Sequence, residues 1–468
     1  MSKHCFAWLR LLPLYFIFTL SLPAVAQHTP HQAETDFIDR IYDHCLTDGR
    51  CYPWLEALCF KVGHRLSGSP EAEKAVQWSK SMLDTLGLDS VWLQPCMVPH
   101  WVRGAAEQVR LVGSKKWGDA PLAALALGGS VGGKVQAEIV EVGTWEQLDE
   151  LGEKGVKGKI VFYNRPMDPT KIRTFEAYGG CVGQRVEGAT RAAKYGAVGV
   201  LVRSMTLRLD DYPHTGAMRY DSAYPFIPAA AISTIAAEKL AQVLREEGRA
   251  RVSMALFCNT LPDAPSYNVI GEIRGSERPN DIILVGGHLD SWDVGHGAHD
   301  DGAGVVQSMD VLRTLRKLGY KPRHTIRCVL FMNEENGLRG GRAYAREAER
   351  KGEYPLASIE SDAGGFTPRG FSFEGDETVF GKFFEKLSTF EPFFEPYGLK
   401  FTKGGSGADI SPLRGLKGLL SGYSPDSQRY FDYHHAESDT FDKVNKRELE
   451  LGTASMAALV YLIDKYGL

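Results

Sequence analysis

Apolar runs alternate with helical patterns in the C-terminal half of the chain. This alternation limits the range of possible folds more than any other feature of the sequence. Residues 282–285 form a continuous apolar run, as expected of a strand buried on both faces. A helical pattern over 304–318 follows and leads to a second apolar run at 325–332. A helix over 338–351 and a strand over 356–360 repeat the alternation. This order predicts an α/β fold with a mostly parallel central sheet flanked by helices.

The chain has 468 residues, more than one ordinary hydrophobic core holds, so we expect two domains. Residues 33–90 carry mainly helical patterns. Between residues 126 and 262, short β-type runs alternate with helical stretches, and no cluster of metal-ligating residue types occurs there. We therefore predict one domain formed by residues 27–125 and 263–468, with a smaller unit over 126–262 inserted into it to shape a site.

The first 26 residues have the pattern of a signal peptide. Lys3 and Arg10 give a basic start, residues 11–22 are almost wholly apolar, and Ala24-Val25-Ala26 supplies small residues for cleavage. The apolar run is too short for a stable membrane span, and an uncleaved N-terminal anchor is the alternative. We predict an exported protein, periplasmic or secreted, with no membrane partner once the signal peptide is removed. The net charge of −4 without a basic block excludes nucleic acid as an expected partner.

Export allows disulfides to form, and seven cysteines follow residue 26. An odd number leaves at least one thiol without an intramolecular partner. Cys45 and Cys51 flank a polar turn, and we expect them to form a bridge. Cys328 lies in an apolar run and is expected to be an inert core thiol.

Histidine and acidic residues follow the first predicted strand, where ligands gather in parallel sheets. His288 and Asp290 are two apart on an extended segment and point to the same side, so Asp290 is expected to brace His288. Asp300 follows in a glycine-rich bend, and we expect it to be shared by two metals. Asp301 is interpreted as its brace or as a helix N-cap. The neighbouring histidines, His296 and His299, are less favoured candidates for metal ligands.

Further acids follow the next two strands. Glu334 and Glu335 are adjacent at a strand end and diverge, so we assign Glu335 to metal and Glu334 to proton transfer. Asp362 stands at the end of the strand over 356–360, and residues 433–440 supply a histidine pair. Two metals can then each take one imidazole and one carboxylate. Such ligands suit zinc, with cobalt or manganese as substitutes.

Four segments resemble one enzyme family: GGHLDSWDVGHGAHDDGAG, FMNEENGLRGG, ESDAGG and YHHAESDT. They look like the co-catalytic zinc aminopeptidases of the MH clan, and in particular the carboxypeptidase Q group. LQPCMVPHWVRG and DYPHTGAMRYD also resemble that group, so the likeness covers nearly the whole mature chain. The resemblance implies a zinc aminopeptidase (phosphorylase/hydrolase-like) fold, an α+β protease-associated domain over 126–262, and a homodimer.

The resemblance also implies a role for each site residue: His288 and Glu335 hold one zinc, Asp362 and His435 hold the other, Asp300 bridges both, Glu334 is the general base, and Asp290 supports His288. His435 is preferred over His434 because the family's ligand precedes an Asp-Thr pair by four positions, here Asp439-Thr440. Every expected metal and base position is filled.

We therefore predict an exported metallo-exopeptidase that hydrolyses the N-terminal peptide bond of dipeptides or short peptides, with two Zn²⁺ per chain. One alternative is a single-zinc enzyme, as in glutaminyl cyclases. Another is a non-enzymatic binding module, as in transferrin receptors. The complete ligand set argues against both. The side-chain preference stays open, as does whether residues 404–409 and those near Tyr423 line a substrate pocket.

Overall fold

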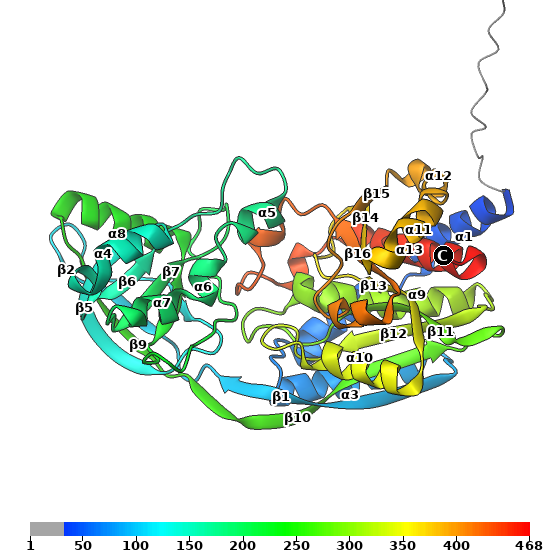
Figure 1. Cartoon of the computed structure of the whole chain (residues 1–468), viewed down its shortest axis with the longest axis horizontal. Coiled ribbons are helices and arrows are strands. Elements are labelled where there is room, and N and C mark those ends of the chain that lie inside the picture. The colour runs from blue at the N-terminus through cyan, green and yellow to red at the C-terminus, as the bar shows by residue number, and fades with distance from the viewer. Residues whose placement is uncertain (1–31) are drawn as a thin grey trace, which may run out of the picture.

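Two eight-stranded sheets organise residues 32–468, the part of the chain that this computed structural model describes (Figure 1). The predicted signal peptide, residues 1–26, lies outside the described residues. Among the helices within 32–468, none combines the length and apolar character needed to cross a membrane. The α/β class predicted for the chain is confirmed, because helices pack on both sheets.

The first sheet carries the candidate site. Its strands in spatial order are β1 (Ser90–Val102), β10 (Asn259–Ile273), β12 (His324–Phe331), β11 (Arg278–His288), β13 (Tyr354–Glu360), β16 (Leu419–Pro425), β14 (Pro368–Glu374) and β15 (Lys400–Lys403). The four central strands β12, β11, β13 and β16 are parallel. The pairings β1–β10, β10–β12 and β14–β16 are antiparallel, so the sheet as a whole is mixed.

Helices cover both faces of this sheet, because the central strands carry successive apolar residues that point alternately to the two faces. Ile283 and Val285 of β11 face a large core, whereas Ile282 and Leu284 face a smaller one. The helices on the large core are α1 (Gln32–Asp48), α2 (Cys51–Ala57), η1 (Leu58–Val62), α3 (Pro70–Asp84), α9 (Ala303–Lys317), α11 (Glu377–Ser388), α12 (Glu391–Phe394) and α13 (Lys446–Tyr466). Helix α10 (Arg339–Lys351) and the turn η4 (Ser411–Leu416) cover the smaller core. The helices expected over 304–318 and 338–351 are thereby confirmed.

The second sheet belongs to a separate lobe, which we call the second unit (residues 108–256). Its strands in spatial order are β3 (Gly118–Pro121), β2 (Gln108–Ser114), β9 (Arg251–Leu256), β5 (Gly133–Val142), β6 (Ile160–Tyr163), β7 (Gly199–Arg203), β8 (Ala229–Ile232) and β4 (Ala124–Ala126). Its helices are α4 (Trp145–Val156), α5 (Thr174–Gly179), α6 (Gly183–Val186), α7 (Gly188–Lys194) and α8 (Thr234–Glu247). The strands of this sheet thus begin before residue 126, where the sequence suggested a boundary.

Two long strands connect the lobes. β1 and β10 pair along nearly their whole length, from Ser90 opposite Glu272 to Val102 opposite Asn259. Figure 1 shows this ribbon along the lower side of the molecule, where it forms one edge of the first sheet and carries the chain into the second unit and back. Short helical turns complete the structure: η2 (Ala298–Gly302), η3 (Glu395–Tyr397), η5 (Tyr430–Asp432) and η6 (Phe441–Lys443).

The cysteines correct one prediction. All seven within residues 32–468 are free and buried, so the expected Cys45–Cys51 bridge is wrong for this structure. Cys45 and Cys51 instead make separate contacts with α9. Cys45 Sγ lies 3.5 Å from Thr314 Oγ1, and the Cys51 backbone N–H donates to Asp310 at 3.0 Å. Cys328 lies buried in β12, where burial raises the pKa of its thiol, as expected of an inert core residue.

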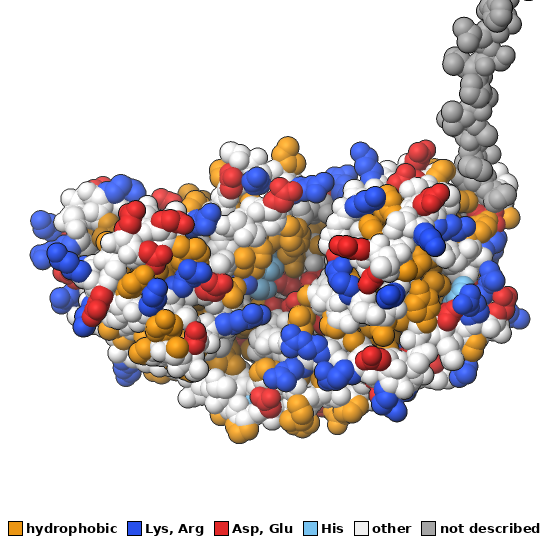
Figure 2. Space-filling view, in the orientation of Figure 1, with side chains coloured by type: hydrophobic (Ala, Val, Ile, Leu, Met, Phe, Trp, Pro, Cys, Tyr) orange, Lys and Arg blue, Asp and Glu red, His pale blue; other side chains and the backbone are white. Residues whose placement is uncertain are grey.

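The strand ends explain where the site forms. His288 ends β11 opposite Phe331 of β12, and Gly286 lies opposite Glu360 of β13. The carboxyl ends of these parallel strands therefore meet at one edge, which is where such sheets bind ligands. In Figure 2, acidic and histidine side chains gather in the hollow between the two lobes.

Candidate metal centre

Asp300 lies at the middle of the predicted site. It sits in the bend just before α9, and its side chain is only 4% exposed. His288 Nε2 lies 3.1 Å from Asp300 Oδ1, and His435 Nε2 lies 3.4 Å from Asp300 Oδ2. One carboxylate thus has an imidazole nitrogen beside each of its two oxygens. This arrangement suits a carboxylate that bridges two cations.

Each histidine also has a second carboxylate. Asp362 Oδ1 lies 3.4 Å from His288 Nε2, and Glu335 Oε2 lies 3.1 Å from His435 Nε2. The shortest distances therefore pair His288 with Asp362 and His435 with Glu335, whereas we expected His288 with Glu335. His288 and Glu335 also lie together with Asp300 in a group placed to hold a metal ion, because β11 lies between β12 and β13 in the sheet and its end is next to the ends of both.

The structure also distinguishes the two adjacent histidines. His434 Nε2 lies 3.8 Å from Asp300 Oδ2, farther than that of His435, and its ring stacks on the His435 ring at a centroid distance of 3.5 Å. The rings of Tyr178 and Phe431 pack against His434 as well. His435 alone of the pair contacts both Asp300 and Glu335, which favours it as the ligand.

Asp290 lies beside the ring of His288 and also bonds to the turn that follows β12. His288 Nδ1 lies 3.0 Å from the backbone carbonyl oxygen of Asp290 and 3.9 Å from its carboxylate oxygen Oδ1. The buried carboxylate also accepts hydrogen bonds from the backbone N–H groups of Asn333, Glu334 and Glu335 at 2.7, 3.0 and 3.3 Å. Asp290 thereby fixes the turn that carries both glutamates.

Two further buried aspartates hold the backbone of the site. Asp301 accepts from His288 N at 3.0 Å and from Gly304 N at 2.9 Å, so it is both a brace and a cap for α9. Asp439 accepts from His299 N at 2.9 Å and from Asp300 N at 3.1 Å. In the sequence, Asp439 served only to place the ligand histidine. Its position four residues after His435 was the available signal for a supporting acid.

Arg65 is a supporting residue that sequence reasoning missed. Its buried guanidinium donates to the carbonyl oxygens of Leu289 at 2.6 Å, His296 at 2.8 Å and Gly297 at 2.9 Å. These bonds shape the loop between His288 and Asp300. No local sequence pattern marks Arg65, because all three acceptors lie more than 200 positions away in the chain.

The two histidines beside Asp300 serve packing. His299 Nδ1 accepts from Gly365 N at 3.1 Å, and its ring stacks on Phe366 at 4.1 Å. His296 Nδ1 accepts from Phe441 N at 3.2 Å. Neither belongs to the groups of described residues that are placed to hold a metal ion, and His288, Asp300, Glu335, Asp362, His434 and His435 all do.

The electrostatics of the cluster favour a cation. Burial raises the pKa of Glu334 to about 8; His288 opposes this shift, and Asp362 adds to it. Burial also raises the pKa values of Glu335 and Asp362. Asp300 Oδ2 is buried and accepts no hydrogen bond. Buried carboxylates with unmet acceptor capacity are costly unless a positive charge compensates them, so the donor set fits bound metal ions.

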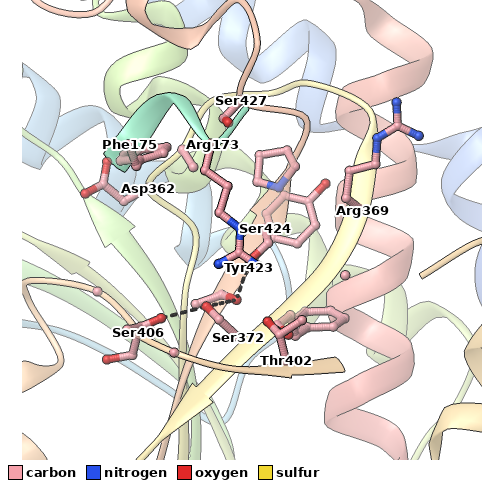
Figure 3. A pocket seen from close by; sticks show the side chains of 18 of the residues that line it. Arg173, Phe175, Asp362, Arg369, Ser372, Thr402, Ser406, Tyr423, Ser424 and Ser427 are labelled. Atoms are coloured by element: carbon pink, nitrogen blue, oxygen red, sulfur yellow. Dashed lines mark hydrogen bonds between the residues drawn. The ribbon is translucent and has the colours of Figure 1, made fainter. Parts of the chain in front are cut away.

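A cavity of about 830 Å³ opens beside Asp362 and Glu360. Of the segment 404–409, residues 404–407 line it, as does Tyr423. Figure 3 shows Arg173 of the second unit extending toward Tyr423 and Ser424. Both lobes therefore contribute to the wall of this cavity, which lies next to a predicted metal ligand.

Comparisons with known proteins agree with this site. Residues 268–460 match the family model described as Peptidase family M28. The chain is 34% identical over 418 residues to carboxypeptidase Q of Bos taurus, covering 88% of this chain and 85% of that protein. The chain belongs to peptidase family M28. The human carboxypeptidase Q is 35% identical to this M28 peptidase, with the same two coverages.

Solved structures extend the likeness to the fold. An M28 peptidase precursor from Shewanella amazonensis SB2B is 33% identical, has a TM-score of 0.86, and covers 92% of this chain and 97% of its own. A zinc aminopeptidase from Bacillus subtilis, at 20% identity and a TM-score of 0.63, has a similar fold over 89% of this chain and 95% of its own. The predicted family is thereby confirmed, and the protein is a peptidase, a hydrolase of the M28 family.

Proposed function

We propose that this M28 peptidase is a two-zinc exopeptidase that releases the N-terminal residue of dipeptides or short peptides. The observation that carries the proposal is the position of Asp300 between two histidine–carboxylate pairs. Imidazole and carboxylate ligands suit zinc. His288 and Asp362 would hold one ion, His435 and Glu335 the other, and Asp300 both. Zinc bound there would lower the pKa of water and polarise a peptide carbonyl.

Glu334 is our candidate for the general base. It follows β12, adjacent to Glu335, on the turn that Asp290 holds. Cations bound beside it would favour its ionised form, which can take a proton from water and return it to the leaving amine. Because Asp290 touches the backbone of Glu334 and not the substrate, we assign it a positioning role.

The charge and the size of the site favour cleavage at the N-terminal end of short peptides. Glu360 and Asp362 both line the cavity, and negative charge there would attract a free α-amino group. A volume of about 830 Å³ lies within the range of pockets for small ligands, which favours short peptides over folded proteins.

Blocking the substrate's amino group tests this direction. We expect a dipeptide with a free amino group to be cleaved at least about 100-fold faster, in kcat/KM, than its N-acetylated form, because acetylation removes the charge that the carboxylates bind. Chromatography of the two products from each peptide measures the ratio. Equal rates would contradict the exopeptidase assignment and leave the peptidase class intact.

The histidine pair gives a second prediction. His435→Ala should lower zinc affinity by at least about tenfold, because it removes a ligand that contacts both Asp300 and Glu335. His434→Ala is the matched control and should keep two ions per chain. Metal content after dialysis distinguishes the variants. Loss of metal in His434→Ala alone would exchange the two assignments.

We further propose that the second unit is a protease-associated domain that shapes access to the site, since Arg173 and Phe175 reach the cavity wall from it. Export to the periplasm or beyond is inferred from the pattern of residues 1–26. A homodimer is inferred from the family resemblance, and sedimentation of the purified chain tests it.

A further inference from the structure

We propose that the second unit completes the metal centre itself: its residues 214–217, which we call the strap, hold the ligand His435 in its binding orientation. The proposal rests on the proposed function in that His435 must ligate metal. It goes further in giving the inserted unit a positioning role at the metal, beyond shaping access. The strap belongs to the segment DYPHTGAMRYD, whose function the sequence left unassigned.

The strap holds His435 by its backbone and its ring. The backbone N–H of Thr215 donates to the carbonyl oxygen of His435 at 3.0 Å. In return, Nδ1 of His435 lies 3.3 Å from the carbonyl oxygen of Thr215. Because Nε2 faces Asp300 and Glu335, a metal-binding His435 carries its hydrogen on Nδ1 and donates it to Thr215. Such a bond fixes both the tautomer and the ring orientation of a ligand.

The strap also contacts the residues on either side of His435. Nδ1 of His214 lies 2.7 Å from the carbonyl oxygen of His434, so this nitrogen is the donor. His214 and Ala436 form an isolated antiparallel bridge. The side chain of His214 is buried, and its own backbone N–H donates to Ser204 Oγ at 2.8 Å, which ties the strap to the strand region of the second unit.

The backbone of His435 needs this support. Its φ is +62°, in the left-handed region, which is unfavourable for a residue with a side chain. A residue stays in such a conformation only where its surroundings fix it. The hydrogen bonds from Thr215 and His214 supply that constraint on both sides of His435.

Arg185 forms hydrogen bonds with the strap. It is 6% exposed, and no carboxylate within residues 32–468 forms an ion pair with it. Its Nη1 lies 3.4 Å from the carbonyl oxygen of Thr215, to which it donates, and 3.4 Å from Nδ1 of His435; its Nε donates to the carbonyl oxygen of Ala217 at 3.3 Å. A guanidinium buried without an acid is unfavourable unless nearby negative charge compensates it, and the acidic metal centre lies next to it.

Gly216 makes this close approach feasible. A Cβ atom there would collide with the Arg185 guanidinium and would lie 2.7 Å from His435 Nδ1. Its φ of +134° is also one that side-chain-bearing residues rarely adopt. The sequence His214-Thr215-Gly216 thus combines a donor, a backbone acceptor and the space that the ligand's ring requires.

Two variants of His214 test the strap by metal binding alone. His214→Phe keeps an aromatic ring but removes the donor, and should lower zinc affinity at one of the two sites by about 10- to 100-fold. His214→Asn places an amide N–H near the position of Nδ1 and should retain affinity within about threefold of wild type. Competition with a chelating dye measures both affinities, and the visible spectrum of the cobalt-substituted protein reports the geometry of the affected ion.

The substitution Gly216→Ala is a second, independent test of the strap. It should weaken the same single site and shift the same cobalt spectrum, because the added methyl displaces the His435 ring. Gly248→Ala is the matched control: Gly248 also has a positive φ, +73°, in the second unit, but nothing lies within 4 Å of its Cβ position. This control should bind both ions as the wild type does.

The outcomes separate the two proposals. If His214→Phe and Gly216→Ala fold and bind both ions with wild-type affinity and spectrum, the strap does not position His435. If Gly216→Ala fails to fold, the comparison of His214→Phe with His214→Asn decides the question, and equal affinities there overturn the proposal. Wild-type protein that binds fewer than two ions would instead contradict the proposed function.

Discussion

Glu334→Gln should keep both zinc ions and yet hydrolyse dipeptides about 10²- to 10⁴-fold more slowly than the wild type. The amide preserves the size of the side chain but cannot accept a proton from water. Within residues 32–468 the side chain of Glu334 forms no hydrogen bond, and Asp290 bonds only to its backbone, so the turn should survive the change.

Steady-state kcat and metal content, measured on the same preparation, test this prediction. Glu437→Gln is the matched control, because Glu437 is an exposed glutamate two positions after His435 and should leave kcat unchanged. Wild-type turnover in Glu334→Gln would remove Glu334 as the base. A loss of metal would instead assign it a role in binding.

Asp300→Ala should empty both metal positions together. Its two carboxylate oxygens lie beside His288 and His435 respectively, so the substitution removes a ligand from both positions at once. It also leaves the carboxylates of Asp362 and Glu335, each beside one of the histidines, without the shared ligand.

Elemental analysis after dialysis measures the result, and activity should fall with occupancy. Asp442→Ala serves as the control, since Asp442 is exposed and pairs only with Lys443 and Thr440. A variant of Asp300 that keeps one tightly bound ion would show that the carboxylate serves a single metal, which would contradict a bridge.

Much of the site was predictable because its residues stand at strand ends. His288, Glu335 and Asp362 each follow a continuous apolar run, and parallel strands bring such ends to one edge. Local sequence therefore sufficed to place them together. It also sufficed for the helices that cover the sheet, whose apolar spacing is regular over 304–318 and 338–351.

The pairing of the ligands was not predictable in the same way. Which carboxylate lies nearest to which histidine depends on side-chain positions, because β11 lies between β12 and β13 in the sheet and its end is next to both. The contacts of Asp290 were only partly predictable for a related reason. Besides lying beside His288, its carboxylate bonds to the turn at Asn333–Glu335, more than 40 residues away in the chain.

Residues that support the site from a distance carried no local signal. Arg65 and His214 each bond to backbone carbonyls more than 200 positions away, so no motif around them indicates a role. The second unit contains no cluster of ligand types, and sequence reasoning therefore gave it no part in metal binding. The Cys45–Cys51 bridge failed similarly, because spacing alone does not show that the Cys45 thiol packs against Thr314 of α9.

Metal content per chain, measured together with hydrolysis of a small dipeptide panel before and after chelation, tests the central claim most directly. The account predicts two zinc ions per chain, loss of activity when a chelator removes them, and recovery when zinc is restored. One ion per chain, or two ions without any peptide turnover, would contradict it and favour a single-zinc cyclase or a binding module.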